Sequence, residues 1–89
     1  RDAVHPLMGE KPSPAMIRQL QDICGQTLDF DPKPHHIHIH RYGEHVELTF
    51  HIHLDGALSL EEAHDYIVKL ENAVEESLEM TATIHADPR

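Results

Sequence analysis

The sequence predicts a small α+β domain with the element order α-β-β-α-β, in which two helices cover one face of a three-stranded mixed sheet. Two stretches alternate between polar and apolar residues, as half-buried strands do: 35–42, where the alternation starts at His36, and 46–54. Segments with helical spacing of apolar residues flank them, at about 14–25 and from residue 60 onward. A chain of 89 residues is long enough for one such domain.

A serine–proline pair begins the first predicted helix. Ser13 is a suitable N-cap, and Pro14 fits the first helical position because its missing N–H is not needed there. Gly25 is a suitable end for this helix. The preceding residues 1–12 mix proline, glycine and charge, which is typical of a linker.

The two alternating stretches form a predicted hairpin with one apolar face and one histidine-rich face. Gly43 and Glu44 form the tight turn between them, since glycine accepts a positive φ. Pairing residue 42 with residue 45 places His36 opposite His51. Side chains in such a pair have Cβ atoms about 4.5–5.5 Å apart, close enough to share one ion. The same face carries further polar residues, namely His38, His40, Glu47, Thr49 and His53.

A capping box marks the start of the second predicted helix. Ser59 is the N-cap and Glu62 lies three residues later, which is the spacing of this motif. The last predicted strand covers about 80–86, and its crossover from 46–54 through the helix makes those two strands parallel. This arrangement brings His85 beside the second strand, with Asp87 projecting from the same face.

Composition excludes several function classes. The formal charge of −9 argues against nucleic acid as a partner, because nucleic-acid binding needs basic patches. Cys24 is the one cysteine, so no internal disulfide forms, and its place on the apolar stripe predicts a buried, inert thiol. No segment approaches the ~18 apolar residues of a membrane span. The chain begins Arg-Asp-Ala, so we expect a fragment of a longer protein.

Ten histidines are the outstanding feature of the composition. Imidazole ligands suit divalent transition metals, and a carboxylate can bridge two ions. Taken singly, each of His38, His40, His45 and His53 fits a solvated surface. Taken together, histidines and an aspartate from three strands are hard to explain without a bound ion.

The order and spacing of these residues resemble the C-terminal cytoplasmic domain of cation diffusion facilitators, which export divalent metals. The distinctive part is the closing Ile84-His85-x-Asp87-Pro88 after a capped helix that carries Ala63-His64 near its start. The segment His-Pro-Leu-Met-Gly-Glu-x-Pro, from residue 5, is similar to the one that leaves the last membrane helix in this family.

The resemblance implies a metallochaperone-like, truncated ferredoxin-like fold and a V-shaped homodimer that binds metal on the sheet face. It implies His35, His51 and His85 as ligands, Asp87 as a bridging carboxylate, and His64 as a secondary position. Residues 1–12 would then follow the last membrane helix, and 13–89 would form the cytoplasmic metal-binding domain of an inner- or plasma-membrane transporter.

The sequence departs from the family pattern at the first strand, where His35 and His36 stand in place of His-Asp. The resemblance favours His35 as the ligand, whereas counting from the hairpin favours His36, and both stay open. The additional histidines could add ions or change the preferred metal.

We expect a regulatory domain whose dimer closes on binding metal and so promotes transport by the membrane domain. Zinc is the first choice for His/Asp ligation, with Fe, Mn, Co, Ni and Cu as alternatives. Two alternatives are a free-standing metallochaperone or metal buffer and a dimerisation module that senses no metal. An enzyme is not expected, because no general base is evident apart from the ligands.

Overall fold

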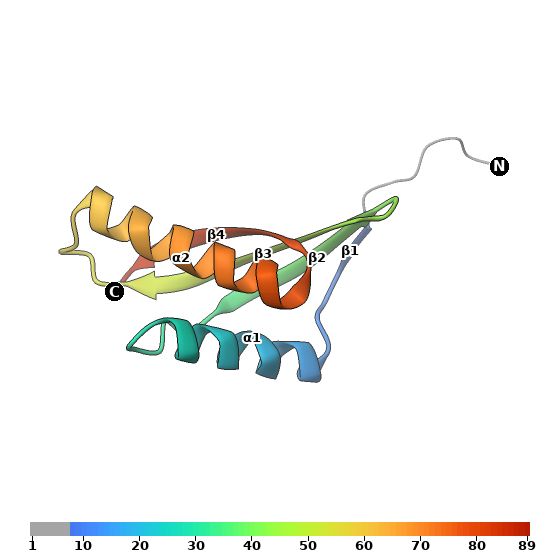
Figure 1. Cartoon of the computed structure of the whole chain (residues 1–89), viewed down its shortest axis with the longest axis horizontal. Coiled ribbons are helices and arrows are strands. Elements are labelled where there is room, and N and C mark those ends of the chain that lie inside the picture. Colours follow the sequence, from blue (N-terminus) through green and yellow to red (C-terminus); the bar gives the residue numbers. More distant parts are fainter. Residues whose placement is uncertain (1–7) are drawn as a thin grey trace.

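The computed structural model describes residues 8–89, and its two helices lie on one face of a four-stranded sheet (Figure 1). Along the chain the elements are β1 (Met8–Glu10), α1 (Pro14–Thr27), β2 (His35–Tyr42), β3 (His45–Leu54), α2 (Leu60–Leu78) and β4 (Thr81–Pro88). The strands lie in the order β1-β2-β3-β4; β3 and β4 are parallel and the other pairs are antiparallel. The predicted α+β class and mixed sheet are confirmed.

The predicted count of three strands is wrong, because β1 lies within the segment interpreted as a linker. Its three residues pair antiparallel with β2, Gly9 opposite His40, and the Glu10 carboxylate accepts a hydrogen bond from Nε of Arg41 at 2.9 Å. Three residues are too few for a periodic pattern, so pairing with β2 defines this strand. Residues 1–7 of the expected linker lie outside the described part of the chain.

Helix α1 begins as predicted but ends later. The Ser13 hydroxyl accepts a hydrogen bond from the Met16 N–H, and a proline occupies the first turn. The helix continues past Gly25 to Thr27, since a glycine inside a helix costs only about 1 kcal/mol. Leu28 is the C-cap of the helix, and its N–H donates a hydrogen bond to the Cys24 carbonyl.

Helix α2 carries the predicted capping box. The Ser59 hydroxyl accepts from the Glu62 N–H, and the Glu62 carboxylate accepts from the Ser59 N–H. Two orphan N–H groups at the helix start are thereby satisfied. The helix ends at Leu78, and its C-cap Glu79 adopts a left-handed conformation with φ of 56°.

The core lies between the helices and the inward face of β2, β3 and β4. Its thiol, Cys24, is fully buried; burial, together with the nearby Asp31 carboxylate, raises the pKa of Cys24 to about 12. A thiol with so high a pKa is a poor nucleophile and ligand, as the sequence predicted. The buried apolar residues are Leu20, Cys24, Leu28, Ile39, Leu48, Phe50, Ile52, Leu54, Leu70, Val74, Ala82 and Ile84.

Two acidic residues of α2 bind the outer edge of β4. Glu75 accepts a hydrogen bond from the Ala82 N–H at 3.0 Å, and Glu71 accepts one from the Ile84 N–H at 3.1 Å. The sequence predicts a solvated helix face for the acidic run Glu71, Glu75, Glu76 and Glu79. That prediction is wrong for the first two. Edge N–H groups of a sheet need partners, and here side chains supply them.

A β-bulge interrupts the hairpin on β2. Pairing is regular from Tyr42 opposite His45 to His38 opposite Thr49, and it then resumes with His35 opposite His51. His36 and Ile37 therefore share the single position opposite Phe50, and His36 takes a positive φ of 49°. Counting from the turn places His36 opposite His51, and this is wrong because it allows for no bulge.

Deleting His36 should remove the bulge without turning either strand over. His35 then remains opposite His51, Ile37 faces Phe50, and the strained left-handed residue disappears, which is worth about 1 kcal/mol. We expect a free energy of unfolding, measured by urea denaturation, that is unchanged or higher by that amount.

Deleting Ile37 is the matched control for this prediction. It shortens β2 equally but leaves His36 to take the inward position of a half-buried apolar residue, at a cost of about 1.5–3 kcal/mol. If deletion of His36 were the more damaging of the two, the bulge would be a requirement of the fold.

Candidate metal centre

Three side chains from three strands meet on the histidine-rich face: His35, His51 and Asp87. His35 Nε2 lies 3.0 Å from Asp87 Oδ2, and His51 Nδ1 lies 3.1 Å from the same oxygen. One nitrogen or oxygen from each residue falls within 4.8 Å of the other two. Between residues 8 and 89, no other group of three or more such ligand atoms is this compact.

Two features of the backbone bring these side chains together. Parallel pairing sets His51 beside His85 and His53 beside Asp87, which carries the carboxylate to the end of β3. The bulge on β2 then places His35, rather than His36, opposite His51. The three side chains remain partly exposed, so an ion can reach them from solvent.

The loop before β2 orients the His35 ring. The Asp31 carboxylate accepts a hydrogen bond from the Lys33 N–H at 2.9 Å, and Lys33 takes a positive φ of 54°. The Lys33 carbonyl then accepts a hydrogen bond from His35 Nδ1 at 2.7 Å. The loop is itself attached to β3, because the Pro32 carbonyl accepts from the His53 N–H. Such an outer partner fixes which nitrogen of a histidine is available to a metal.

The chemistry of this arrangement fits a cation. A carbonyl only accepts, so His35 Nδ1 carries a hydrogen; in the neutral ring, Nε2 directs a lone pair at the Asp87 carboxylate. Two acceptors 3.0 Å apart need a proton or a metal ion between them. The donor set of two imidazoles and one carboxylate suits zinc and its neighbours in the first transition row.

The shifts in pKa favour the protonated His35 ring beside the ionised Asp87 carboxylate. The hydrogen bond to the Lys33 carbonyl raises the pKa of His35, with a further contribution from Asp87 and an opposing effect of burial. Hydrogen bonds from His35 and then His51 lower the pKa of Asp87. The carboxylate is thus ionised and ready to accept a cation well into the acidic range.

Two further histidines of the predicted set border the group of three. The His85 ring stacks on that of His51 with centroids 5.0 Å apart. The exposed His36 ring lies 5.1 Å from His51 and 5.2 Å from His35, because its positive φ turns it toward them. Both are close enough to join the site after a rotation of the side chain.

His53 is a neighbour that the sequence analysis left as surface. It is half-buried, and its ring stacks on His35 with centroids 4.5 Å apart and planes at 17°. Its Nδ1 is buried and has no hydrogen-bond partner in the described part of the chain. The alternation along β3 predicts that His53 lies on this face. It does not predict which ring of another strand His53 contacts.

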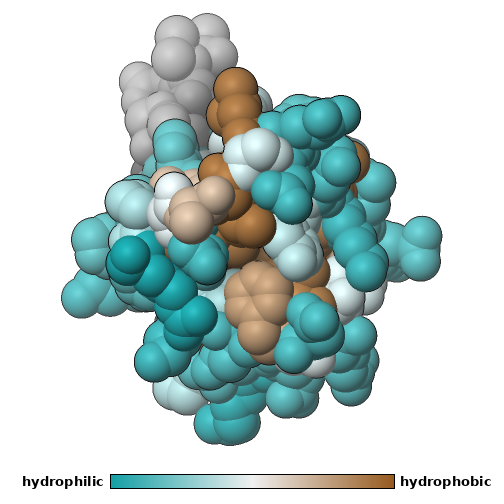
Figure 2. Space-filling view, turned by 90° about the vertical axis from the view of Figure 1, so that its left-hand side faces the viewer, coloured by the Kyte–Doolittle hydropathy of each residue, from teal (hydrophilic) through white to brown (hydrophobic). Residues whose placement is uncertain are grey.

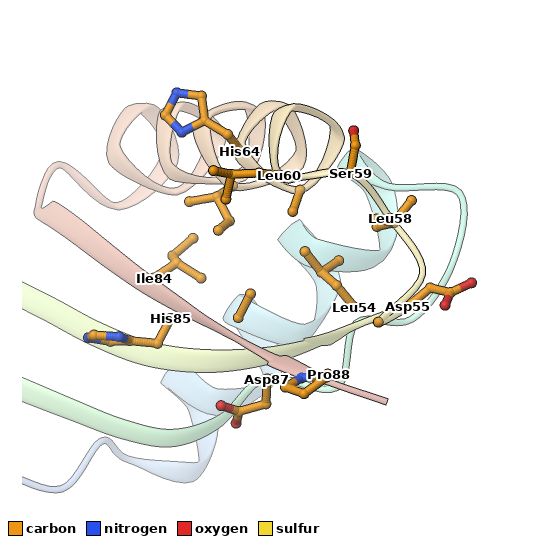
Figure 3. A pocket seen from close by; sticks show the side chains of 14 residues that line it. Leu54, Asp55, Leu58, Ser59, Leu60, His64, Ile84, His85, Asp87 and Pro88 are labelled. Atoms are coloured by element: carbon orange, nitrogen blue, oxygen red, sulfur yellow. The ribbon is translucent and has the colours of Figure 1, made fainter.

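His64, the remaining predicted residue, lies apart from the group of three. It is exposed on α2 and lines a groove of about 550 Å³, which it shares with His85 and Asp87 of β4. Figure 3 shows His64 on the opposite side of the groove from His85 and Asp87. Apolar side chains also gather at this end of the molecule (Figure 2), and Leu60 of the groove is 88% exposed.

Comparison with known proteins was made against families, curated proteins and solved structures. Residues 12–89 match a family described as "Cation efflux protein, cytoplasmic domain". No curated protein matches the chain. Among residues 8–89, no helix combines the length and the apolar character needed to cross a membrane.

Solved structures of transporter domains have the same fold. CzrB, described as a proposed zinc transporter, is 27% identical with a TM-score of 0.67, over 89% of this chain and 99% of that one. Its zinc form is 28% identical with a TM-score of 0.69, over 92% and 94% of the two chains. The metal-bound C-terminal domain of the CzcD transporter from Thermotoga maritima is 25% identical with a TM-score of 0.65, over 86% and 94%.

The family match covers almost the whole described chain, and the fold agrees with domains of zinc and metal transporters. The protein therefore belongs to the cation efflux family, the cation diffusion facilitators, and residues 12–89 form its cytoplasmic domain.

Proposed function

We propose that this domain binds a divalent transition metal, zinc in the first place, through His35, His51 and Asp87, and that binding regulates transport. The observation that carries the proposal is the pair of facing acceptors, His35 Nε2 and Asp87 Oδ2, held 3.0 Å apart by the Lys33 carbonyl. His85 is positioned to bind an ion bridged through Asp87. The domain acts as a ligand-binding module and has no enzymatic activity.

Zinc is favoured by the donor set and by the relatives. Imidazole and carboxylate ligands suit Zn²⁺, and one solved relative is a zinc form. Fe, Mn, Co, Ni and Cu fit the same donors, since affinity alone does not settle selectivity.

The groove between α2 and β4 supports a homodimer as the working form. It combines exposed apolar surface at Leu60 with the metal-site residues His85 and Asp87, and His64 lies across it. A second copy seated here would cover the apolar side chains and bring its own histidines near the ions. Closure of such a dimer would then be transmitted to the membrane part of the same transporter.

Metal can drive closure only by binding the closed form more tightly. The formal charge of −9 on each copy opposes close approach when no metal is bound. Bound cations reduce that repulsion. If the second copy contributed ligands to the ion, the closed dimer would bind metal more tightly than the open one.

Zinc binding should depend on the ligands named above. Titration calorimetry should show micromolar or tighter binding to the unaltered domain. His51→Ala or Asp87→Ala should weaken it by at least about 100-fold, because even an outer partner of a ligand contributes 10–100-fold. His45→Ala is the matched control, a histidine on the same strand that is far from Asp87 along the ladder. Binding that neither variant weakens would exclude this site.

Zinc affinity should rise with pH. The proton on His35 must leave before Nε2 can bind metal, and its raised pKa extends the competition to higher pH than for an ordinary histidine. Asp87 adds no competition until much lower pH, because its pKa is lowered. We expect the zinc affinity to rise by up to about tenfold per pH unit for each proton displaced. This rise should level off above the pKa of His35. Affinity measured from pH 5 to pH 8 with no slope would contradict the assignment.

Zinc should also change the shape of the dimer. Small-angle scattering, with sedimentation to fix the oligomeric state, should show a dimer whose radius of gyration falls when zinc is added. Asp87→Ala should remain dimeric but keep its metal-free dimensions. A domain that binds zinc as a monomer, or as a dimer of constant dimensions, would favour a metal buffer over a regulator.

A further inference from the structure

We propose that His38, His40 and Glu47 form a second, separate divalent-metal site on the hairpin half of the histidine-rich face. These residues take no part in the group around Asp87, and the inference goes beyond the function proposed above. The first site lies where β2 begins and where β3 and β4 end. The second would lie nearer the turn at Gly43, in the regular part of the hairpin.

The ladder places the three side chains on one patch of the sheet. His40 is opposite Glu47 and His38 is opposite Thr49, and residues two apart on a strand share a face. Directly opposed side chains have Cβ atoms about 4.5–5.5 Å apart. A carboxylate and two imidazoles therefore project together from adjacent strands. Thr49, which offers no strong metal ligand, separates this patch from His51.

The two imidazoles are already close to the spacing that one ion requires. Their ring centroids lie 6.2 Å apart with planes at 26°. At Zn–N distances of about 2.0–2.1 Å and a tetrahedral angle, two rings on one zinc have centroids about 5 Å apart. In the first site, His35 and His51 lie 5.6 Å apart. The pair His38 and His40 thus needs to close by only about 1 Å, which side-chain rotation can provide.

Within residues 8–89, the side chains of His38, His40 and Glu47 form no hydrogen bonds to other groups. Nδ1 of His40 is buried beside Gly9 of β1 and has no hydrogen-bond partner among residues 8–89, so no hydrogen bond fixes the orientation of the ring. In the same part of the chain, the Glu47 carboxylate takes part in no ion pair. Arg41, the nearest cation along β2, is engaged with Glu10 of β1 at 2.9 Å. Hydrogen bonds and ion pairs within residues 8–89 therefore leave this patch available to a divalent ion.

The donor set indicates what would bind and how tightly. Two histidines and one carboxylate, with further positions open to water, suit first-row divalent transition metals. The ligand atoms are less preorganised here than around Asp87, where they already lie within 4.8 Å of one another. Drawing the side chains together costs binding energy, so the second site should be the weaker of the two.

The test is a zinc titration followed by calorimetry and by native mass spectrometry, in a variant that lacks the first site. With His51→Ala and Asp87→Ala combined, one ion per chain should still bind, more weakly than in the unaltered domain. Adding His38→Ala and His40→Ala should abolish this binding. Glu47→Gln, added in place of the two histidine changes, should weaken it at least about tenfold.

A matched control distinguishes the site from a diffuse histidine-rich surface. His45→Ala removes a histidine two residues from Glu47 on the same face and should leave the residual binding intact. Equal loss in this variant would overturn the proposal, as would residual binding that survives removal of His38 and His40. Circular dichroism of every variant should match the unaltered domain. Failure of the first site to bind would leave this result unaffected, since the measurement is made without it.

Discussion

The Asp87 carboxylate connects three strands at one end of the histidine-rich face. Asp87 accepts hydrogen bonds from His35 on β2 and His51 on β3 while standing on β4. This depends on parallel pairing of β3 with β4, which in turn needs α2 as the crossover between them. The position of the candidate metal centre thus depends on α2, the helix that the Ser59 capping box begins.

The sequence predicted those elements whose signals are local. Strict alternation identified β2 and β3, and the capping box identified the start of α2. Helix α1 extends past its predicted end at Gly25. A glycine ends a helix when it adopts a left-handed conformation, and Gly25 keeps a helical one. Strand β1 was missed because three residues contain no period, and its pairing with β2 is a tertiary feature.

The histidine-rich face could be predicted, but the members of the site could not. Alternation assigns a side chain to a face, whereas the choice between His35 and His36 rests on one bulged residue. The orientation of His35 rests on the Lys33 carbonyl, which a backbone turn at Asp31 sets in place. Neither the bulge nor the turn has a sequence signature strong enough to be recognised in advance. The resemblance to cation diffusion facilitators favoured His35, which the strand pairing places opposite His51.

The carboxylates of Glu71 and Glu75 determine how this sheet can associate with others. They occupy the outward N–H groups of Ile84 and Ala82, and the period of two makes residues 86 and 88 the next outward positions. Pro88 has no N–H, so only Ala86 offers a free donor along that edge. A neighbouring chain that added a strand to β4 would find few free N–H donors and would have to displace the Glu71 and Glu75 carboxylates. Strand addition is thus disfavoured at the β4 edge, and an association at this end of the sheet would use side-chain surfaces instead.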